Sequence, residues 1–304
     1  MKFNSQILTA CAIFGLTAAG PILKKRSGDA DILNYALTLE HLEDTFYRQG
    51  LANFTESDFN DAGYDSHFYK NLMEVAYDEK THVSFLTSAL QAAGAAAVAE
   101  CTYAFGVDSV ETFIATASVL EGVGITAYLG AAAHIANPAY LTAAASILTV
   151  ESRHNAYLRD ALNKSPFPQA FDVPLDYDEV YSLAAPFIVS CPSSNPTFLT
   201  LKEFPGLTVS SQDAKIKTNT VLDVYANIPD DTTVYASFAT VTGPVFAEIQ
   251  CTGHGDYEVT VPAGVHGQSY LIFTSSNSTV NDDTTLAGPA IVEIKGTDGA
   301  PKYA

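Results

Sequence analysis

Hydrophobic residues recur at helical spacing through the first 190 residues of the chain. Apolar side chains repeat at a period close to 3.6, which is typical of helices that bury one face. The expected helices cover residues 29–51, 65–93, 108–135, 137–162 and 176–185. Asp108 and Asn137 are the expected caps of the third and fourth helices, and 55–63 is expected to be a loop or single turn. Four helices of about 20 to 30 residues predict a four-helix bundle.

The pattern changes near residue 190, where short alternating runs separated by turn residues replace the helical spacing. The expected strands are VLDVYA, TVYASFATV, VFAEIQ, YEVTV, SYLIFT and AIVEI. Runs of this length and spacing predict a small antiparallel β-sandwich. The fold class is therefore α + β in two domains. The expected segments are a signal peptide and short propeptide (1–26), a helical bundle (27–187), a linker (188–208), a β-sandwich (209–296) and a tail (297–304).

The composition of the chain limits the kinds of molecule that it is expected to bind. The 304 residues are 47% hydrophobic and 16% charged, a balance typical of packed cores rather than of disordered chains. The formal net charge of −19 argues against nucleic acid and anionic membrane surfaces as partners. The longest apolar region, 114–150, is interrupted by Glu121, His134 and the pair at 137–138, so we expect no membrane span.

The N-terminal residues predict export. Residues 1–20 combine an early lysine with a short apolar stretch that ends in small residues, as a secretory signal does. The dibasic pair at 25–26 indicates either a processing site or a plain basic junction. Three sequons, at Asn53, Asn163 and Asn277, are acceptors for glycosylation in an exported protein. We therefore expect a secreted glycoprotein, located outside the cell or in the cell wall.

Three cysteines remain once the signal is removed, and export exposes them to an oxidising environment. The sequence allows three pairings. We favour Cys101–Cys191, because Cys101 lies between the second and third helices and Cys191 follows the fifth. This bridge would clamp the connection to the end of the helical domain. Cys251 would then be the odd residue, for which a free buried thiol is the plain expectation.

Two Glu-x-x-His pairs stand on alternate helices of the expected bundle. The first is Glu79 and His82 in VAYDEKTHVSFL, and the second is Glu151 and His154 in VESRHNAYL. Side chains three residues apart share one face of a helix, so each pair could present two metal ligands together. A single pair would also suit the wet face of a helix. Two pairs on alternate helices favour a shared site.

The other two long helices repeat a second pattern, a glutamate followed seven residues later by a tyrosine. These are Glu40 with Tyr47 and Glu121 with Tyr128. Seven residues make almost two turns, so we expect each tyrosine to lie beneath the glutamate of its own helix. Glu121 stands among small apolar residues, where an unpaired carboxylate is costly to bury. A bound cation would remove that cost.

Together these residues match the ligand scheme of dinuclear carboxylate sites: a glutamate from each of two helices and a Glu-x-x-His from each of the other two. The expected ligands are Glu40, Glu79, His82, Glu121, Glu151 and His154. The glutamates of the two pairs would bridge two iron or manganese ions, and the other two would bind terminally. Tyr47 and Tyr128 would hydrogen-bond the ligands or carry a radical, with core packing as the alternative.

Several other polar residues have two interpretations. Glu43, one turn beyond Glu40, is either an acid beside the site or a surface residue. Arg159 either pairs with a carboxylate near the site or is an ordinary surface arginine. His134 is expected to pack or to cap its helix. His254 and His266 lie in glycine-containing loops, where exposed histidines are commoner than metal ligands.

The chain also resembles a known family. YALTLEHLEDTFYRQGL, FTESDF, DEKTHVSFL, CTYAF, VESRHNAYLR and TLAGPAIVEI carry the resemblance. Residues 30–162 look like the ferritin-like superfamily, and most of the mature chain resembles the secreted fungal ferritin-like proteins described as stress-response or late sexual development proteins. The resemblance implies a ferritin-like bundle with a di-iron or di-manganese site, and it gives no sign of a cage-forming subunit.

Two functions are consistent with the sequence. The first is redox chemistry on a small oxidant, peroxide or dioxygen, in stress response, as a peroxidase-, catalase- or oxidase-like oxidoreductase. No organic cofactor is expected, because the chain contains neither a dinucleotide-binding nor a P-loop motif. The alternative is a metal-free or structural protein of the cell wall or matrix, whose β-sandwich binds carbohydrate or protein.

Overall fold

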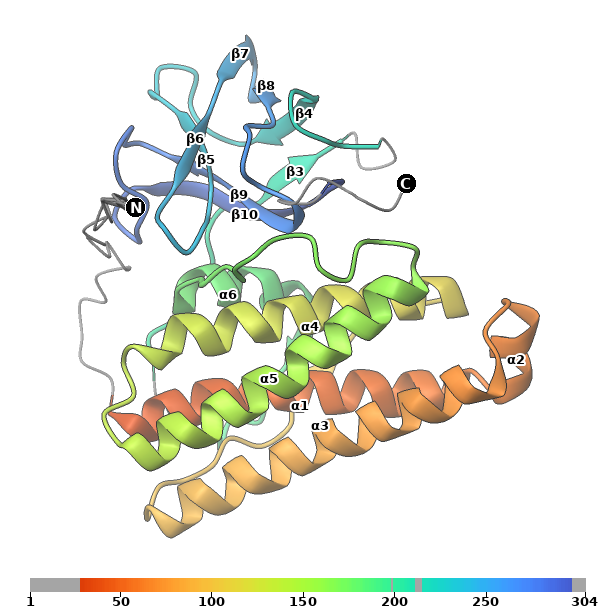
Figure 1. Ribbon diagram of the computed structural model, residues 1–304. Coiled ribbons are helices and arrows are strands. Elements are labelled where there is room, and N and C mark those ends of the chain that lie inside the picture. The colour runs from red at the N-terminus through yellow and green to blue at the C-terminus, as the bar shows by residue number, and fades with distance from the viewer. Residues whose placement is uncertain (1–27, 198, 211–214, 297–304) are drawn as a thin grey trace, which may run out of the picture.

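The computed structural model describes residues 28–197, 199–210 and 215–296, so the expected signal peptide, propeptide and tail lie outside the described residues. Within these ranges the chain is mixed: helices fill the first part and antiparallel strands the second (Figure 1). The four long helices are α1 (Asp29–Asn53), α3 (Ser66–Ala92), α4 (Val110–Ala132) and α5 (Pro138–Ala161). Two short helices accompany them, α2 (Glu56–Asp61) and α6 (Tyr177–Ala184).

Side-chain caps fix where the long helices begin. Asp65 accepts a hydrogen bond from the backbone N–H of Phe68 at the start of α3, and Asn137 caps α5 just before Pro138. The cap of α4 is Ser109 rather than the expected Asp108. Ser109 accepts the backbone N–H of Thr112, which leaves the neighbouring aspartate to accept the Thr112 hydroxyl.

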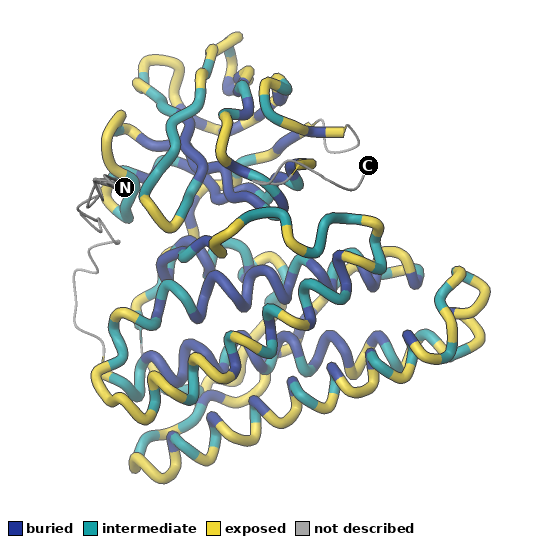
Figure 2. The backbone as a smooth tube through the Cα atoms, viewed as in Figure 1, coloured by how far each residue is buried: buried dark blue, intermediate teal, exposed yellow. Residues whose placement is uncertain are grey.

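The long helices differ in burial. α1 packs against α3, α4 packs against α5, and α1 and α4 contact each other. Most of α1 and α4 is buried, whereas α3 and α5 bury one face and expose the other (Figure 2). Among the described residues, α4 is by length and composition apolar enough to cross a membrane, but 72% of its most apolar window is buried inside the protein. That burial is what the core helix of a soluble protein shows, so α4 is weak evidence for a span.

Two four-stranded antiparallel sheets form within the described ranges after residue 206. Their strands are β3 (Leu207–Val209), β4 (Val221–Ala226), β5 (Tyr235–Phe238), β6 (Val245–Ala247), β7 (Ile249–Gly253), β8 (Asp256–Thr260), β9 (Gly267–Thr274) and β10 (Thr285–Ile294). The strand orders are β10-β9-β5-β6 and β3-β4-β8-β7, and apolar residues of both sheets share one core. The expected strand VFAEIQ divides at Glu248, where the chain leaves one sheet and enters the other.

The connection between α3 and α4 is tied to the end of the helical region. β1 (Thr102–Tyr103) pairs with β2 (Ile188–Ser190) in a two-stranded sheet that the sequence pattern did not predict. A disulfide joins Cys101 to Cys191 beside it, which is the favoured pairing. Cys251 is a free thiol and is exposed, so the expectation of a buried thiol is wrong.

β9 and β10 lie against the helices through polar contacts. The two terminal nitrogens of the Arg159 guanidinium, Nη1 and Nη2, donate to Glu293 of β10, at 3.0 and 2.8 Å. Tyr270 of β9 donates its hydroxyl to the carbonyl of Gly122, 3.0 Å away. A Cβ at position 122 would lie 2.5 Å from Nε2 of Gln268, so a larger residue there would displace the Gln268 side chain. The sheet is therefore packed directly on α4 and α5.

Candidate metal centre

Each long helix directs one glutamate into the space between the helices. These are Glu40 on α1, Glu79 on α3, Glu121 on α4 and Glu151 on α5, and all four are 0% exposed. His82 and His154, one turn after the glutamates of α3 and α5, are also buried. The helical spacing puts each histidine on the same face as its glutamate, so the six residues predicted from the sequence converge.

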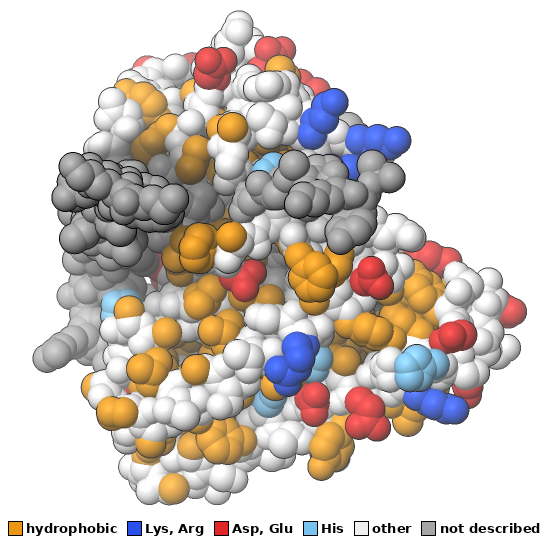
Figure 3. Space-filling model, in the orientation of Figure 1, with side chains coloured by type: hydrophobic (Ala, Val, Ile, Leu, Met, Phe, Trp, Pro, Cys, Tyr) orange, Lys and Arg blue, Asp and Glu red, His pale blue; other side chains and the backbone are white. Residues whose placement is uncertain are grey.

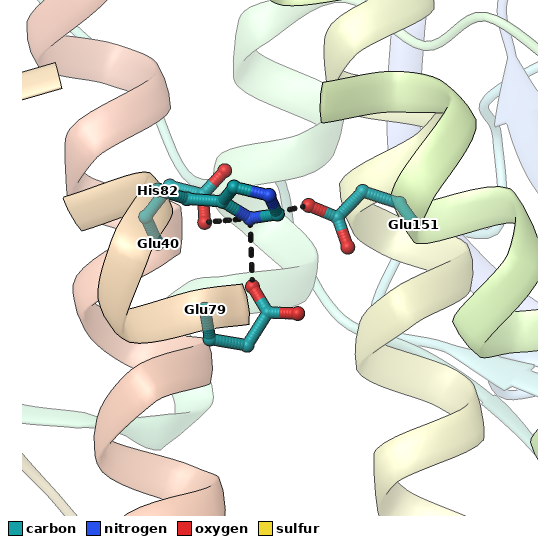
Figure 4. Close-up of side chains that lie close together, drawn as sticks. All are labelled: Glu40, Glu79, His82 and Glu151. Atoms are coloured by element: carbon teal, nitrogen blue, oxygen red, sulfur yellow. Dashed lines mark hydrogen bonds and ion pairs between the residues drawn. The ribbon is translucent and has the colours of Figure 1, made fainter. Parts of the chain in front are cut away.

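The first group of ligand atoms surrounds His82. Its Nδ1 lies 3.2 Å from Oε2 of Glu40, 3.2 Å from Oε2 of Glu79 and 3.2 Å from Oε1 of Glu151. Figure 4 shows these side chains pointing toward one another from three helices. One donor atom from each of the four residues lies within 4.8 Å of the others, close enough to hold one ion.

The second group surrounds His154. Its Nδ1 lies 2.9 Å from Oε1 of Glu79, 3.3 Å from Oε2 of Glu121 and 3.4 Å from Oε2 of Glu151. Donor atoms of these four residues also lie within 4.8 Å of one another. Glu79 and Glu151 belong to both groups, and each turns one oxygen toward each histidine. This sharing is the geometry that bridging carboxylates require.

Burial leaves much of this polar set without hydrogen bonds. The buried atoms with no hydrogen-bond partner among the described residues include Glu40 Oε2, Glu79 Oε1, Glu121 Oε2, both Glu151 side-chain oxygens and His154 Nδ1. The two histidines lie 2.9–3.4 Å from these oxygens, but two imidazoles are too few to offset four buried carboxylates, which are strongly unfavourable to bury. Cations placed among these oxygens would satisfy them, so the residues present fit a pair of metal ions.

The pKa shifts have the same origin. Burial raises the pKa of Glu79, and the charges of Glu151 and Glu121 raise it further. Burial also raises the pKa of Glu121 to about 7, although the neighbouring His154 opposes the shift. For His82, burial lowers the pKa, but hydrogen bonds to the surrounding carboxylates outweigh burial and raise it overall. Positive charge placed among these closely packed carboxylates would therefore stabilise their ionised forms.

The two tyrosines bind glutamates across the helix pair rather than on their own helices. Tyr47 of α1 donates its hydroxyl to Oε1 of Glu121, 2.5 Å away, and Tyr128 of α4 donates to Oε1 of Glu40. These bonds confirm that Tyr47 and Tyr128 hydrogen-bond members of the predicted ligand set. The partner is the glutamate of the other helix, because seven residues advance a helix by about 10 Å, too far for each tyrosine to reach the glutamate of its own helix. α1 and α4 are antiparallel, which brings each tyrosine level with the opposite glutamate.

Asp78 contacts His154, and the sequence analysis did not predict this contact. Its Oδ2 lies 3.3 Å from Nε2 of His154, the ring nitrogen that faces away from the carboxylates. Carboxylates in this position fix the orientation and tautomer of a metal-binding histidine. The Asp78 side chain is 46% exposed, so it links the buried histidine to solvent. The position of this aspartate, directly before Glu79 in DEKTH, was the feature of the sequence that could have indicated a role beside the site.

Glu43 is buried, so its interpretation as a surface residue is wrong. Its Oε2 has no hydrogen-bond partner among the described residues. Burial raises its pKa, and the charges of Glu151, Glu79, Glu40 and Glu121 raise it further. The carboxyl group of Glu43 is thus a fifth acid, close enough to the other four glutamates for their charges to raise its pKa.

The remaining candidates lie apart from the centre. Arg159 is buried and pairs with Glu293, away from the ligand glutamates. The His134 ring packs 6.1 Å from the Tyr177 ring, as expected for a packing residue. His254 is exposed, and neither it nor His266 belongs to a metal-sized group among the described residues. The three sequon asparagines, Asn53, Asn163 and Asn277, are exposed.

A small apolar cavity of about 20 Å³ lies between the helices beside Tyr128. Its lining comes from all four long helices and includes Leu39, Phe85, Tyr128 and Ala144. Tyr128 also donates to Glu40, so the cavity ends at a residue in contact with the ligand set. Apolar cavities of this kind stay dry and admit apolar molecules.

Comparison with known proteins agrees with this geometry. Residues 28–164, which contain all four long helices, match the family model of the ferritin-like domain. The chain is similar to Protein rds1 of Schizosaccharomyces pombe, with 28% identity over 243 residues. That alignment covers 77% of this chain and 58% of the relative, so the chain spans little more than half of that protein's length. The helical part is thus similar to the ferritin-like domain, and it carries buried groups that could hold metal.

Proposed function

We propose that the helical part is a ferritin-like four-helix bundle that binds a dinuclear iron or manganese centre. The six ligands are Glu40, Glu79, His82, Glu121, Glu151 and His154. The observation that carries the proposal is the sharing of Glu79 and Glu151 by two buried four-residue groups. Four carboxylates offset the charge of two divalent ions, and one imidazole per ion suits iron and manganese.

We further propose that the loaded protein reacts with peroxide or dioxygen as a stress-response oxidoreductase. Two such ions, when bound, supply the electrons that reduce an oxidant. The chain holds the ligands in place: Tyr47 and Tyr128 donate to two of the glutamates, and Asp78 orients His154. The apolar cavity beside Tyr128 is suited to a small apolar oxidant such as dioxygen.

Metal analysis of the purified full chain tests the binding proposal. After reconstitution and removal of loose metal, about two equivalents of iron or manganese per chain are expected. Glu151→Ala, which removes a carboxylate shared by both groups, should lose nearly all bound metal, whereas Glu74→Ala, which removes an exposed acid on α3, should keep it. Absence of tightly bound metal from the reconstituted wild type would contradict the proposal.

Activity assays on the loaded protein then test the chemistry. Peroxide breakdown, peroxidase turnover and oxidation of ferrous iron by dioxygen distinguish the three candidate reactions. The Glu151→Ala variant, which should lose nearly all metal, supplies the background rate for each. A loaded wild type that matches this background in all three assays would leave a metal-binding protein without the proposed activity.

Two broader proposals concern the whole chain. We infer two domains, the bundle over 27–187 and a β-sandwich over 209–296 joined by the linker 188–208, and separate apolar cores support this division. We also infer a secreted glycoprotein, because all three sequons are exposed and the Cys101–Cys191 bridge suits an oxidising compartment. Expression in a eukaryotic host with mass spectrometry of the medium tests both secretion and the occupancy of the sequons.

A further inference from the structure

A cavity of about 350 Å³ lies at the junction of the helices and the sheets, outside the metal centre. α4 and α5 form one wall, β9 forms the second, and the loop 162–176 forms the third. Gly122 on α4 immediately follows the ligand Glu121, and Asn155 on α5 immediately follows His154. The cavity thus lies against the outer sides of α4 and α5, whose inner sides carry candidate metal ligands.

The size and position of the cavity suit a small molecule. Ligand sites occupy about 300–1,000 Å³ and occur preferentially where two structural units meet. Its walls are held in place: Tyr270 donates to the Gly122 carbonyl, and Gln268 donates to Tyr270 and to the Val119 carbonyl. Asn155 is fixed by a 2.7 Å hydrogen bond to the Ser118 carbonyl. The cavity is therefore preformed.

The charges around the cavity favour a neutral ligand. The buried guanidinium of Arg159 donates to Glu293 and to the Ser165 carbonyl, which neutralises its charge. Of the other charged lining residues, Arg153 and Asp172 have opposite signs. Gln268 keeps its amide oxygen as an acceptor, because its nitrogen already donates twice, whereas the amides of Asn155 and Gln169 can supply both a donor and an acceptor in the same space. This lining suits a molecule with many hydroxyl groups and no net charge.

The loop adds a flat apolar surface to this polar lining. Phe167 is 78% exposed and stands between two prolines that also line the cavity. Figure 3 shows hydrophobic side chains at the surface along the junction of helices and sheets. An exposed aromatic ring beside hydrogen-bonding groups suits a ligand with one apolar face and a polar edge. A pyranose ring has this combination.

We propose that this cavity binds a neutral saccharide unit, with its ring face against Phe167 and its hydroxyl groups directed to the amides and to Asp172. The site is independent of the metal centre. It uses none of the six ligands, and its recognition groups come from the loop 162–176 and from the outer faces of α4, α5 and β9. Saccharide binding therefore does not require that metal be bound.

Titration calorimetry of the full chain with three neutral trisaccharides tests the proposal. The probes are trisaccharides of β-linked glucose, of β-linked N-acetylglucosamine and of α-linked mannose. At least one is expected to bind with a Kd in the millimolar range or tighter, and Phe167→Ala should weaken it by about tenfold or more. Asp172→Ala should weaken it as well.

The matched control is Phe171→Ala. Phe171 is 67% exposed and lies on the same loop, but it does not line the cavity. This variant should keep the affinity of the wild type within about twofold. Because both phenylalanines are exposed, neither variant should unfold the protein, and thermal melting checks this. The proposal is overturned if none of the three probes binds at about 10 mM, or if Phe167→Ala and Phe171→Ala bind equally well.

Discussion

The two halves of the helical part use one ligand pattern in different surroundings. α1 with α3, and α4 with α5, each supply a glutamate, a tyrosine seven residues later and a Glu-x-x-His. Three residues after the first glutamate, however, one half has Glu43 and the other has Gly124. Directly before the Glu-x-x-His, one half has Asp78 and the other has Val150. The repeat is thus confined to the six candidate ligands and the two tyrosines.

The residues that differ fit together across the halves. A Cβ at Gly124 would lie 2.9 Å from Oε1 of Glu43, so the glycine of one half leaves space for the acid of the other. Asp78 contacts His154 of the opposite half, and the tyrosines also cross from one half to the other. The symmetric set of six residues is therefore surrounded by an asymmetric set of neighbours, which would make the two proposed metal positions inequivalent.

The largest expected effect separates shared from unshared ligands. Glu151→Ala removes a carboxylate common to both groups, whereas Glu40→Ala removes one that belongs to a single group. Glu151→Ala should therefore lose nearly all bound metal, and Glu40→Ala should keep about one equivalent of the two that this ligand scheme holds. Metal analysis after reconstitution measures both. Equal losses from the two variants would show that sharing does not distinguish these glutamates.

The backbone surroundings of α4 and α1 differ at Gly130 and Gln49. Each position lies nine residues after the glutamate that its helix contributes to the candidate metal centre. A Cβ at Gly130 would lie 1.7 Å from the carbonyl oxygen of Leu175, a backbone atom that cannot move aside easily. Gly130→Ala should lower the free energy of unfolding by about 1–3 kcal/mol. Gln49 is exposed, and Gln49→Ala should change it by no more than about 0.5 kcal/mol. Urea unfolding measures both, and equal values would remove this difference between the halves.

The ligands could be predicted from the sequence because their signal is local. Spacings of three and seven residues fix which helical face a side chain occupies, whatever the tertiary structure. The crossed tyrosines, the contact between Asp78 and His154, and the pairing of β1 with β2 depend on which helices and strands become neighbours. No periodicity within one helix carries that information. The burial of Glu43 could not be predicted either, because it depends on Gly124, which lies on another helix.

The contact of Asp78 with His154 provides a further test of inequivalence. Asp78→Ala should weaken metal binding by about 10- to 100-fold, because a partner of this kind orients the ligand. Glu74→Ala, which removes an exposed acid one turn earlier on α3, is the control for the lost charge and should leave affinity unchanged. Competition with a chelator measures the affinity of both variants. Equal weakening in the two variants would assign the effect to long-range charge instead.

The smallest expected effect concerns Glu43, the buried acid that has a glycine as its counterpart. Its pKa is raised by burial and then by the neighbouring carboxylates, so the metal-free fold favours the protonated form. Its contribution to stability is present below the unfolded-state pKa and is lost as the pH rises toward the folded-state pKa. Glu43→Gln stays neutral, so in metal-free protein this variant should gain stability over wild type as the pH rises from 5 to 7, by at most about 1.4 kcal/mol per pH unit.

Urea unfolding of chelator-treated protein at pH 5, 6 and 7 measures this gain, with the exposed Glu74→Gln as the matched control. Glu74→Gln should show no such trend, because an exposed acid keeps similar surroundings in the folded and unfolded states. In metal-loaded protein the gain should shrink, since bound cations offset the charges of the ligand glutamates that raise the pKa of Glu43. A gain that is independent of both pH and metal would mean that Glu43 is only a packing residue. The acid in one half and the glycine in the other would then differ in shape alone.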